Sequence, residues 1–295
     1  MTSDGMFTVR DAVGKGAEFF KRKGIESARL DAELLVGAAV GMDRLHIYLN
    51  LDRPLNDAER DRARELILRR STREPVAYIL GKREFRSRDF DVNPAVLIPR
   101  PETEMLVDIC LERLAIRFAE ADSAYRLLEF GAGSGAIGVS IAAEAPKSQI
   151  VATEISAAAA EVARRNAQRH GVAERIEIRV QSDFAGITGP FHAIISNPPY
   201  IAETEASSLP VDVARFEPRE ALFAGPDGTD AIRFLLSSEP ALLYASGFLL
   251  IEIDHGQMPL VRDMAQQYGM ELHEALHDYA GVERFALLSR RSAGL

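Results

Sequence analysis

The chain has 295 residues, of which 47% are hydrophobic, so it is long enough for one large domain or two smaller ones with an ample core. Its formal net charge is −9, but residues 1–100 carry +3 and the rest −12, which makes the C-terminal two thirds a poor non-specific binder of nucleic acid. We expect no membrane span and no signal peptide, and the single cysteine, Cys110, excludes an internal disulfide framework and fits a reducing cytoplasm.

Residues 1–75 have the apolar spacing of helices and form the first predicted domain. Helices are expected after the capping residues Thr8, Ser27 and Asn56, and the first two end at Gly24 and Gly41. In the second helix one face is expected to be apolar, and in the third the arginines are expected to point outward. The predicted inward residues are Leu30, Leu34, Leu35 and Ala38 in the second helix, and Leu66 and Ile67 in the third.

Residues 76–100 change to a shorter period and are predicted to form a β-hairpin linker, with strands at 76–81, 84–85 and 90–92. From residue 101 onward helix and strand patterns alternate, which is typical of a mostly parallel sheet covered by helices. Residues 271–278 and 285–289 close it as an antiparallel hairpin. The predicted fold class is therefore α/β, with domain boundaries at 1–75, 76–100 and 101–295.

A glycine-rich turn follows the first strand of this α/β region. Residues 127–130 are an apolar strand, and the turn consists of Gly131, Ala132, Gly133, Ser134 and Gly135 before a helix of small residues. Glycines let the backbone approach a ligand, and the helix start supplies free N–H groups. The spacing GxGxG lacks the third glycine position of the dinucleotide motif, and no Lys-Ser/Thr follows, so it is not a phosphate-binding P-loop. A tight turn without a ligand remains the alternative.

Three further residues are predicted at the carboxyl ends of the next two strands. Glu154 closes the strand 149–154, where acidic residues bind ribose hydroxyls in nucleoside-binding α/β folds. Asp183 and Phe184 follow the strand 176–180 and are placed to flank an adenine, by a hydrogen bond and by ring contact. A solvated helix cap for each acid, and a core position for the Phe, remain the alternatives.

The fourth strand, 191–196, ends in Asn197-Pro198-Pro199-Tyr200. The two prolines have φ near −65° and no N–H groups, so the turn is stiff and cannot join a sheet. The Asn197 side-chain oxygen and the Pro198 carbonyl can both accept hydrogen bonds from a flat NH2 group, and the Tyr200 ring can cover its face. This turn therefore predicts a binding site for a planar amide or amine. A Pro-Pro turn that only closes an ordinary strand remains the alternative.

Taken together, these motifs resemble the bacterial release factor glutamine methyltransferases, which are class I enzymes dependent on S-adenosyl-L-methionine (AdoMet). The resemblance covers nearly the whole chain and is most specific at residues 75–81, 97–104, 131–136, 197–200 and 216–225. It implies a helical N-terminal substrate-recognition domain, a hairpin linker and a Rossmann-like methyltransferase domain. It also implies transfer of a methyl group from AdoMet to the side-chain amide nitrogen (N5) of the glutamine in a GGQ motif of peptide chain release factors, with S-adenosyl-L-homocysteine as product.

The resemblance assigns roles residue by residue. Residues 131–135, Glu154 and Phe184 match cofactor-binding positions, although relatives more often have Asp and Trp at the last two. Residues 197–200 match the segment that binds the substrate glutamine, with Asn197 also near the cofactor. Arg100 and Glu102 remain undecided between a role in the active-site floor or in docking of the release factor and a surface ion pair. Closure of residues 217–219 over the cofactor is equally undecided. No metal site is expected, because His273 and His277 fall in a predicted strand without a third ligand.

Three other functions remain open on sequence grounds. An adenine-N6 DNA methyltransferase uses the same four-residue motif, but it needs a basic DNA cleft, which the acidic C-terminal region does not predict. A glutamine methyltransferase for a ribosomal protein shares the core, and a non-catalytic binding module would keep the fold alone. We expect a monomeric cytoplasmic enzyme whose partners are release factors, without direct binding to nucleic acid or membrane.

Overall fold

The computed structural model describes residues 6–118, 124–238 and 241–291. The chain divides into two compact units, and the second is interrupted in sequence by a short piece of the first. The first unit comprises Met1–Lys82 and Pro210–Phe216, and the second comprises Arg83–Leu209 and Glu217–Leu295. Each unit has its own apolar core and is described separately.

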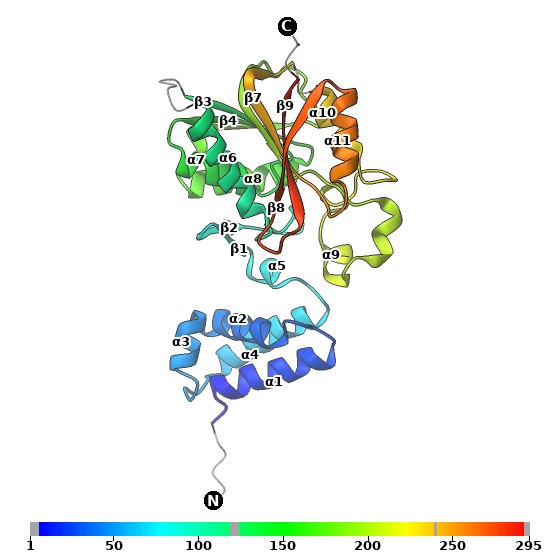
Figure 1. The fold of residues 1–295 in the computed structure, drawn as a ribbon. Coiled ribbons are helices and arrows are strands. Elements are labelled where there is room, and N and C mark those ends of the chain that lie inside the picture. The colour runs from blue at the N-terminus through cyan, green and yellow to red at the C-terminus, as the bar shows by residue number, and fades with distance from the viewer. Residues whose placement is uncertain (1–5, 119–123, 239–240, 292–295) are drawn as a thin grey trace, which may run out of the picture. The chain divides into compact units, whose positions relative to one another are not determined.

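The first unit is helical (Figure 1). Thr8 and Asn56 both form capping boxes, which satisfy the free N–H groups at the starts of α1 and α4. Gly41, at φ 69°, ends α2 in the left-handed conformation that glycine adopts most readily. The helices are α1 (Val9–Arg22), α2 (Ala28–Val40), α3 (Arg44–Leu49), α4 (Asp57–Ser71), α5 (Val76–Leu80) and α9 (Val211–Phe216).

The predicted inward face of α2 is confirmed in part. Leu35 is fully buried and Ala38 packs against the core, whereas Leu30 is 41% exposed and the buried face also includes Ala32. Small residues occupy this face because α1 approaches closely: a Cβ added at Gly16 would lie 3.3 Å from the Ala32 Cβ. Ser27 precedes α2 but its side chain makes no capping hydrogen bond.

Arg70 also departs from the prediction that the arginines of α4 point outward. Its side chain is 6% exposed, and its Nε donates to the Asp31 carboxylate at 2.7 Å. Its Nη1 donates to Asp212 of α9, also at 2.7 Å. A buried guanidinium between two carboxylates is the arrangement in which desolvation of all three charges is offset. Arg70 therefore attaches α9 to the helical unit.

Residues 76–80 form the short helix α5 and not the predicted strand. Pro75 precedes α5 with extended backbone, and Gly81 at φ 71° ends it. Five residues are too few for periodicity to distinguish a buried helix from a buried strand. The hairpin is confirmed after this helix, as β1 (Lys82–Phe85) and β2 (Arg88–Asp91).

The second unit contains a seven-stranded sheet in the order β5-β4-β3-β6-β7-β9-β8, which confirms the predicted α/β class. β3 to β7 are parallel, and β9 is antiparallel to both β7 and β8. Residues 271–289 thus form the predicted closing hairpin. The strands are β3 (Tyr125–Phe130), β4 (Ser148–Glu154), β5 (Ile176–Val180), β6 (Phe191–Ser196), β7 (Leu243–Glu252), β8 (Met270–His277) and β9 (Glu283–Arg290).

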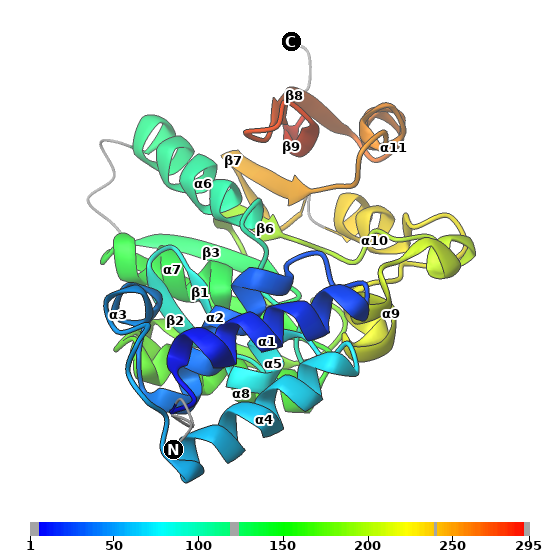
Figure 2. The same cartoon turned by 90° about the horizontal axis from the view of Figure 1, so that it is seen from below.

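Helices cover both faces of this sheet (Figure 2). One face packs against α6 (Thr103–Arg117), α7 (Ala136–Glu144) and α8 (Ala157–Arg169), and this core includes Cys110. The other face packs against α10 (Asp230–Ser238) and α11 (Met258–Gln267). The 3-10 turns η1 (Ala173–Arg175), η2 (Glu203–Ser208) and η3 (Arg219–Ala221) lie in the connections. Within the three described ranges, no helix combines the length and apolar character that crossing a membrane requires.

The order of the strands explains where a ligand can bind. β3, β4, β5 and β6 are parallel neighbours, so their carboxyl ends meet at one edge of the sheet. β3 lies between β4 and β6, and at such a point the connections leave in opposite directions and open a crevice. The predicted convergence of four strand ends is therefore confirmed.

Candidate active site

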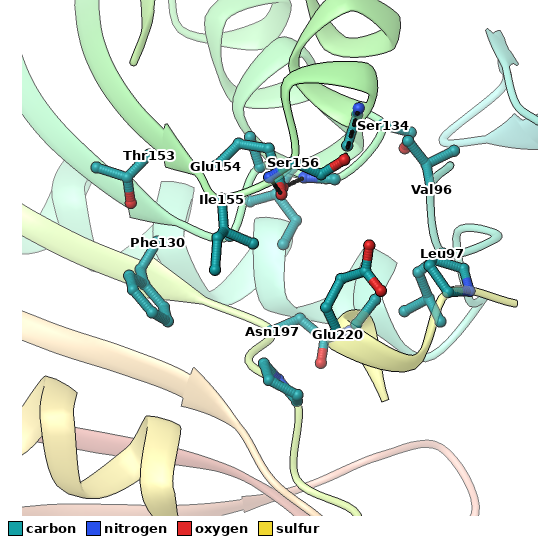
Figure 3. Close-up of a pocket in the computed structure, with 18 of the residues that line it drawn as sticks. Val96, Leu97, Phe130, Ser134, Thr153, Glu154, Ile155, Ser156, Asn197 and Glu220 are labelled. Atoms are coloured by element: carbon teal, nitrogen blue, oxygen red, sulfur yellow. Dashed lines mark hydrogen bonds between the residues drawn. The ribbon is translucent and has the colours of Figure 1, made fainter. Parts of the chain in front are cut away.

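A cavity of about 320 Å³ opens at this edge of the sheet, entirely within the second unit. Its floor is formed by the ends of β3, β4 and β6, and segments 95–103 and 218–221 complete the walls. Figure 3 shows Phe130 and Thr153 on one side of the cavity and Val96 and Leu97 on the other. The lining is mainly apolar, with a few polar groups at fixed positions, as is usual for small-molecule sites.

The glycine turn contributes backbone to the cavity. Gly131 and Gly133 have φ of 75° and 54°, and a Cβ on either would meet no described atom within 4 Å. The left-handed conformation therefore explains these two glycines, and their bare backbone faces open space. Gly135 differs, because a Cβ added to it would lie 3.2 Å from the Ala163 Cβ of α8. Gly135 does not line the cavity, whereas Ala132 and Ser134 do.

Glu154 lies at the end of β4 and is 7% exposed. Its Oε2 accepts a hydrogen bond from the Gly133 N–H at 2.8 Å, and its Oε1 accepts one from the Ser156 N–H at 2.9 Å. A carboxylate has about four acceptor sites, so further capacity remains for hydroxyl groups in the cavity. Glu154 therefore fixes the glycine turn and at the same time offers a ligand its acceptors.

Asp183 and Phe184 are not among the described residues that line the cavity. Asp183 is exposed and its Oδ1 accepts from the Ala185 N–H, which closes a local turn. The Phe184 ring packs against Phe130 and Phe234, with centroids 5.8 and 5.1 Å apart, and both of these partners line the cavity. Phe184 thus supports the wall from behind. Gln181 and Ser182 of the same loop line the cavity instead, and no motif singled them out.

The Asn197–Tyr200 turn follows β6 directly, and Asn197 and Pro199 line the cavity. Figure 3 shows Asn197 across the cavity from Glu154. Pro198 is buried and Tyr200 is half-buried, and neither is counted in the described lining. Burial raises the pKa of the Tyr200 phenol to about 12, so it stays neutral at physiological pH.

Behind Asn197 lies a chain of two buried polar residues that sequence reasoning missed. The Asn197 Nδ2 donates to the Thr103 Oγ1 at 3.1 Å, and this hydroxyl donates to the Glu252 Oε2 at 2.8 Å. Burial raises the pKa of the Glu252 carboxyl to about 7, and the hydrogen bond from Thr103 opposes this effect. Thr103 falls in the segment 97–104 noted above and Glu252 ends β7, but only the fold shows that the two connect to Asn197.

Sequence comparison covers both units. The PrmC N-terminal domain family matches residues 11–81, and the methyltransferase small domain family matches residues 104–214. A release factor glutamine methyltransferase from Moorella thermoacetica is 42% identical over 287 residues, covering 96% of this chain and 99% of its own length. One from Geobacter sulfurreducens is 39% identical and covers 95% of each chain. The chain belongs to the release factor glutamine methyltransferase family.

Solved structures agree with this fold assignment. The hMettl16 catalytic domain in complex with MAT2A 3'UTR hairpin 1 superposes with a TM-score of 0.56 at 14% identity, covering 81% of this chain and 82% of that one. At this identity the similarity establishes the fold alone. The chain therefore has the class I methyltransferase architecture that its family implies.

The segment that follows the Asn197 turn in this methyltransferase is held by a half-buried ion pair, in which the Arg100 side chain is 31% exposed. Glu217 is 5% exposed, and its carboxylate accepts from the Arg100 Nη2 at 2.7 Å and from the Ile98 N–H at 3.2 Å. The next residues, Pro218 and Glu220, line the cavity. The pair is therefore not a surface ion pair, and it holds one wall of the cavity in place. Glu102 is exposed at the start of α6.

Another buried acid, Glu129, lies two residues before the glycine turn. Burial raises its pKa to about 8, and the Gly138 N–H donates to it. A Cβ at Gly138 would lie 2.3 Å from the Glu129 Oε2, so only glycine leaves room for this carboxyl group. Glu129 therefore connects β3 to the first turns of α7.

Proposed function

We propose that the cavity binds AdoMet and that the enzyme transfers its methyl group to the side-chain amide nitrogen of the GGQ glutamine in peptide chain release factors, leaving S-adenosyl-L-homocysteine. One observation carries this proposal: Asn197 lines the same cavity as Glu154 and the glycine turn. An acceptor for an amide and acceptors for a ribose thus share one enclosed space. The names of the relatives supply the release factor as the protein substrate.

The lining residues fit this cofactor. Glu154 retains acceptor capacity for a ribose diol, and the exposed backbone at Gly131 and Gly133 permits close approach of a polar chain. Phe130, Ile155 and neighbouring apolar groups suit a purine ring. When bound, AdoMet supplies an electrophilic methyl group on a positively charged sulfur.

The protein's own task is to make an amide nitrogen react. That nitrogen is a poor nucleophile, because its lone pair is delocalised into the carbonyl group. In this proposal the Asn197 Oδ1 and the Pro198 carbonyl accept its two N–H bonds, which orients the nitrogen and favours negative charge on it as the N–C bond forms. The C–S bond breaks with its electron pair staying on sulfur, and one N–H proton then leaves to water. Tyr200, held neutral by burial, covers the amide and excludes water.

The same arrangement discriminates between glutamine and glutamate. A glutamate carboxylate would place two acceptors opposite two acceptors, and a site built to accept N–H bonds rejects such a group strongly. We further propose that the helical region 1–75 recognises the release factor, that 76–100 is a linker, and that 101–295 is the methyltransferase domain. A monomeric state and a cytoplasmic location remain predictions.

The function is tested with tritiated AdoMet and four parallel acceptors: a purified release factor, its GGQ Gln→Ala variant, a ribosomal protein fraction and DNA. Label is expected in the unmodified release factor alone. Label in DNA or in ribosomal protein would favour one of the other methyltransferase functions. Equal labelling of the Gln→Ala variant would contradict the proposed target atom.

A further inference from the structure

We propose that Thr103 and Glu252 are positioning residues that fix the rotation of the Asn197 carboxamide, so that its oxygen and not its NH2 group faces the substrate. This inference rests on the function proposed above, because it concerns the selectivity of the same site. Its basis is the geometry of three side chains from three separate elements.

The direction of the hydrogen bonds follows from counting hydrogens. The Thr103 hydroxyl has a single hydrogen, and it donates that hydrogen to the Glu252 Oε2 at 2.8 Å. Only lone pairs of the Thr103 oxygen then point at Asn197, whose Nδ2 donates to them at 3.1 Å. Rotating the amide by half a turn would place its oxygen against those lone pairs with no hydrogen between. The rotated state therefore loses one hydrogen bond and gains a repulsive contact.

Because Thr103 and Glu252 are buried, water cannot replace a hydrogen bond that is lost between them and Asn197. Thr103 is 4% exposed and Glu252 is 1% exposed. An unpaired polar atom at such a position carries its full desolvation cost. The preference for one amide rotation is consequently stronger here than it would be on the surface.

Rigid elements hold the three groups in register. Asn197 and Glu252 each lie one residue beyond the paired residues Ser196 of β6 and Ile251 of β7, so the two run side by side. Thr103 is the first residue of α6, which packs on the same face of the sheet as α7 and α8. The Asn197 backbone is held by the two prolines that follow it. Rotation of the side-chain amide is thus the main freedom that remains, and Thr103 restricts it.

The charge on Glu252 sets the direction of the chain. As a carboxylate it can only accept, which commits the Thr103 hydrogen to it. When protonated it can donate to Thr103 instead, and the Thr103 hydrogen is then free to turn towards Asn197. Other charged or titratable groups that act on this carboxyl are Arg284, Glu102, Arg100 and Tyr200.

The consequence for the reaction is selectivity. An Asn197 oxygen facing the substrate accepts an N–H bond from glutamine and repels a glutamate carboxylate. An Asn197 NH2 group in the same place would do the reverse. Thr103 and Glu252 therefore determine, through Asn197, which of two nearly isosteric side chains the site accepts.

The decisive variant is Thr103→Val, which keeps the shape of the side chain and removes the hydroxyl, compared with Thr103→Ser, which keeps the hydroxyl. Binding of release factor peptides with Gln or Glu at the methylated position is measured alongside kcat and KM. Thr103→Val is expected to lower kcat/KM and to narrow the Gln-to-Glu affinity ratio, each by about tenfold. Thr103→Ser is expected to stay within about threefold of the unmodified enzyme. AdoMet affinity is measured for both variants as well, because Thr103 also lines the cavity.

Ser140→Ala is the matched control, because it removes another buried hydroxyl, one without a hydrogen-bond partner in the described part of the chain. It is expected to leave the Gln-to-Glu ratio unchanged. Unaltered selectivity in Thr103→Val, or equal losses in Thr103→Ser, would overturn the inference. Should Thr103→Val fail to fold, Glu252→Met frees the Thr103 hydrogen and is expected to give the same loss of selectivity, and a retained ratio in that variant overturns the inference as well.

An NMR measurement on the Asn197 side chain separates this inference from the proposed function. With 15N-labelled asparagine, the Asn197 NH2 signals are expected to exchange slowly with solvent and to lose that protection in Thr103→Val. This holds even if the enzyme methylates no release factor, in which case the proposed function fails alone. Identical Asn197 signals in the two proteins would refute the hydrogen-bonded orientation itself.

Discussion

Replacing Glu252 by glutamine should change the way in which stability depends on pH. Glu252 is 1% exposed, and burial raises the pKa of its carboxyl from an ordinary 4.5 to about 7. In the unfolded chain this group ionises near pH 4.5, whereas in the folded protein it keeps its proton until about pH 7. The unfolded state therefore binds fewer protons between these values, and the folded protein loses stability as the pH rises through this window.

The size of the effect follows from the two pKa values. At about 1.36 kcal/mol for each pH unit between them, the ionised carboxylate costs the folded state roughly 3 kcal/mol above pH 7 and nothing below pH 4.5. Glutamine has nearly the same shape and does not titrate. The free energy of unfolding of Glu252→Gln minus that of the unmodified protein should thus rise by roughly 3 kcal/mol from pH 4.5 to pH 8.

Urea denaturation followed by circular dichroism at a series of pH values measures this difference. Glu129, whose pKa burial raises to about 8, is present in both proteins, so its contribution cancels. Altered hydrogen bonding to Thr103 adds an offset that does not depend on pH. A difference that stays constant from pH 4.5 to pH 8 would refute the argument, because it would mean that Glu252 titrates equally in both states.

Three further predictions concern other groups. Asn197→Ala should abolish methylation of a release factor in the tritium assay while AdoMet affinity by isothermal titration stays within about tenfold, or 1.4 kcal/mol, and full activity would contradict the amide-binding role. Glu154→Ala removes the acceptor of the Gly133 N–H and should weaken AdoMet binding by roughly 10- to 100-fold in the same titration; an unchanged Kd would argue against the ribose site. Arg70→Met leaves Asp31 buried without its partner and should destabilise the helical unit by roughly 3–5 kcal/mol in urea, whereas adding Asp31→Leu should recover most of that loss.

The α/β part of the fold could be predicted from sequence because its signals are local. The strands around 127–130, 149–154, 176–180 and 191–196 are short apolar runs bounded by turn residues, and each appears in the structure close to its predicted limits. Residues 76–80 were assigned wrongly because five apolar residues fit a helix as well as a strand. The buried face of α2 was predicted only in part: Leu35 follows the apolar pattern, but Ala32 is buried because α1 approaches closely, which is a tertiary property.

In the candidate site, too, residues with a local sequence signal could be predicted and residues joined only by tertiary contacts could not. The glycine turn, Glu154 and Asn197 were found because each follows a strand, and the parallel order brings them to one cavity. Thr103 and Glu252 could not be assigned, since 149 residues separate them and nothing in either neighbourhood indicates a shared hydrogen bond. Asp183 and Phe184 do not line the cavity, which Gln181 and Ser182 of the same loop do, so the predicted adenine contact of the first two residues remains a prediction.

The assignment of Pro210–Phe216 to the helical unit means that the polypeptide passes between the two units three times. After a single cut near residue 82, the N-terminal helices would still contact α9 of the other fragment, through pairs such as Arg70–Asp212. Deleting residues 1–82 would remove Arg70, which pairs with Asp212 of α9. The segment Pro210–Phe216 would then remain in the methyltransferase unit without the helices that it packs against. A truncation meant to isolate the methyltransferase unit should therefore also replace residues 210–216 by a short loop from Leu209 to Glu217. Comparing the free energy of unfolding of truncated enzymes with and without this replacement would show whether the unit folds by itself.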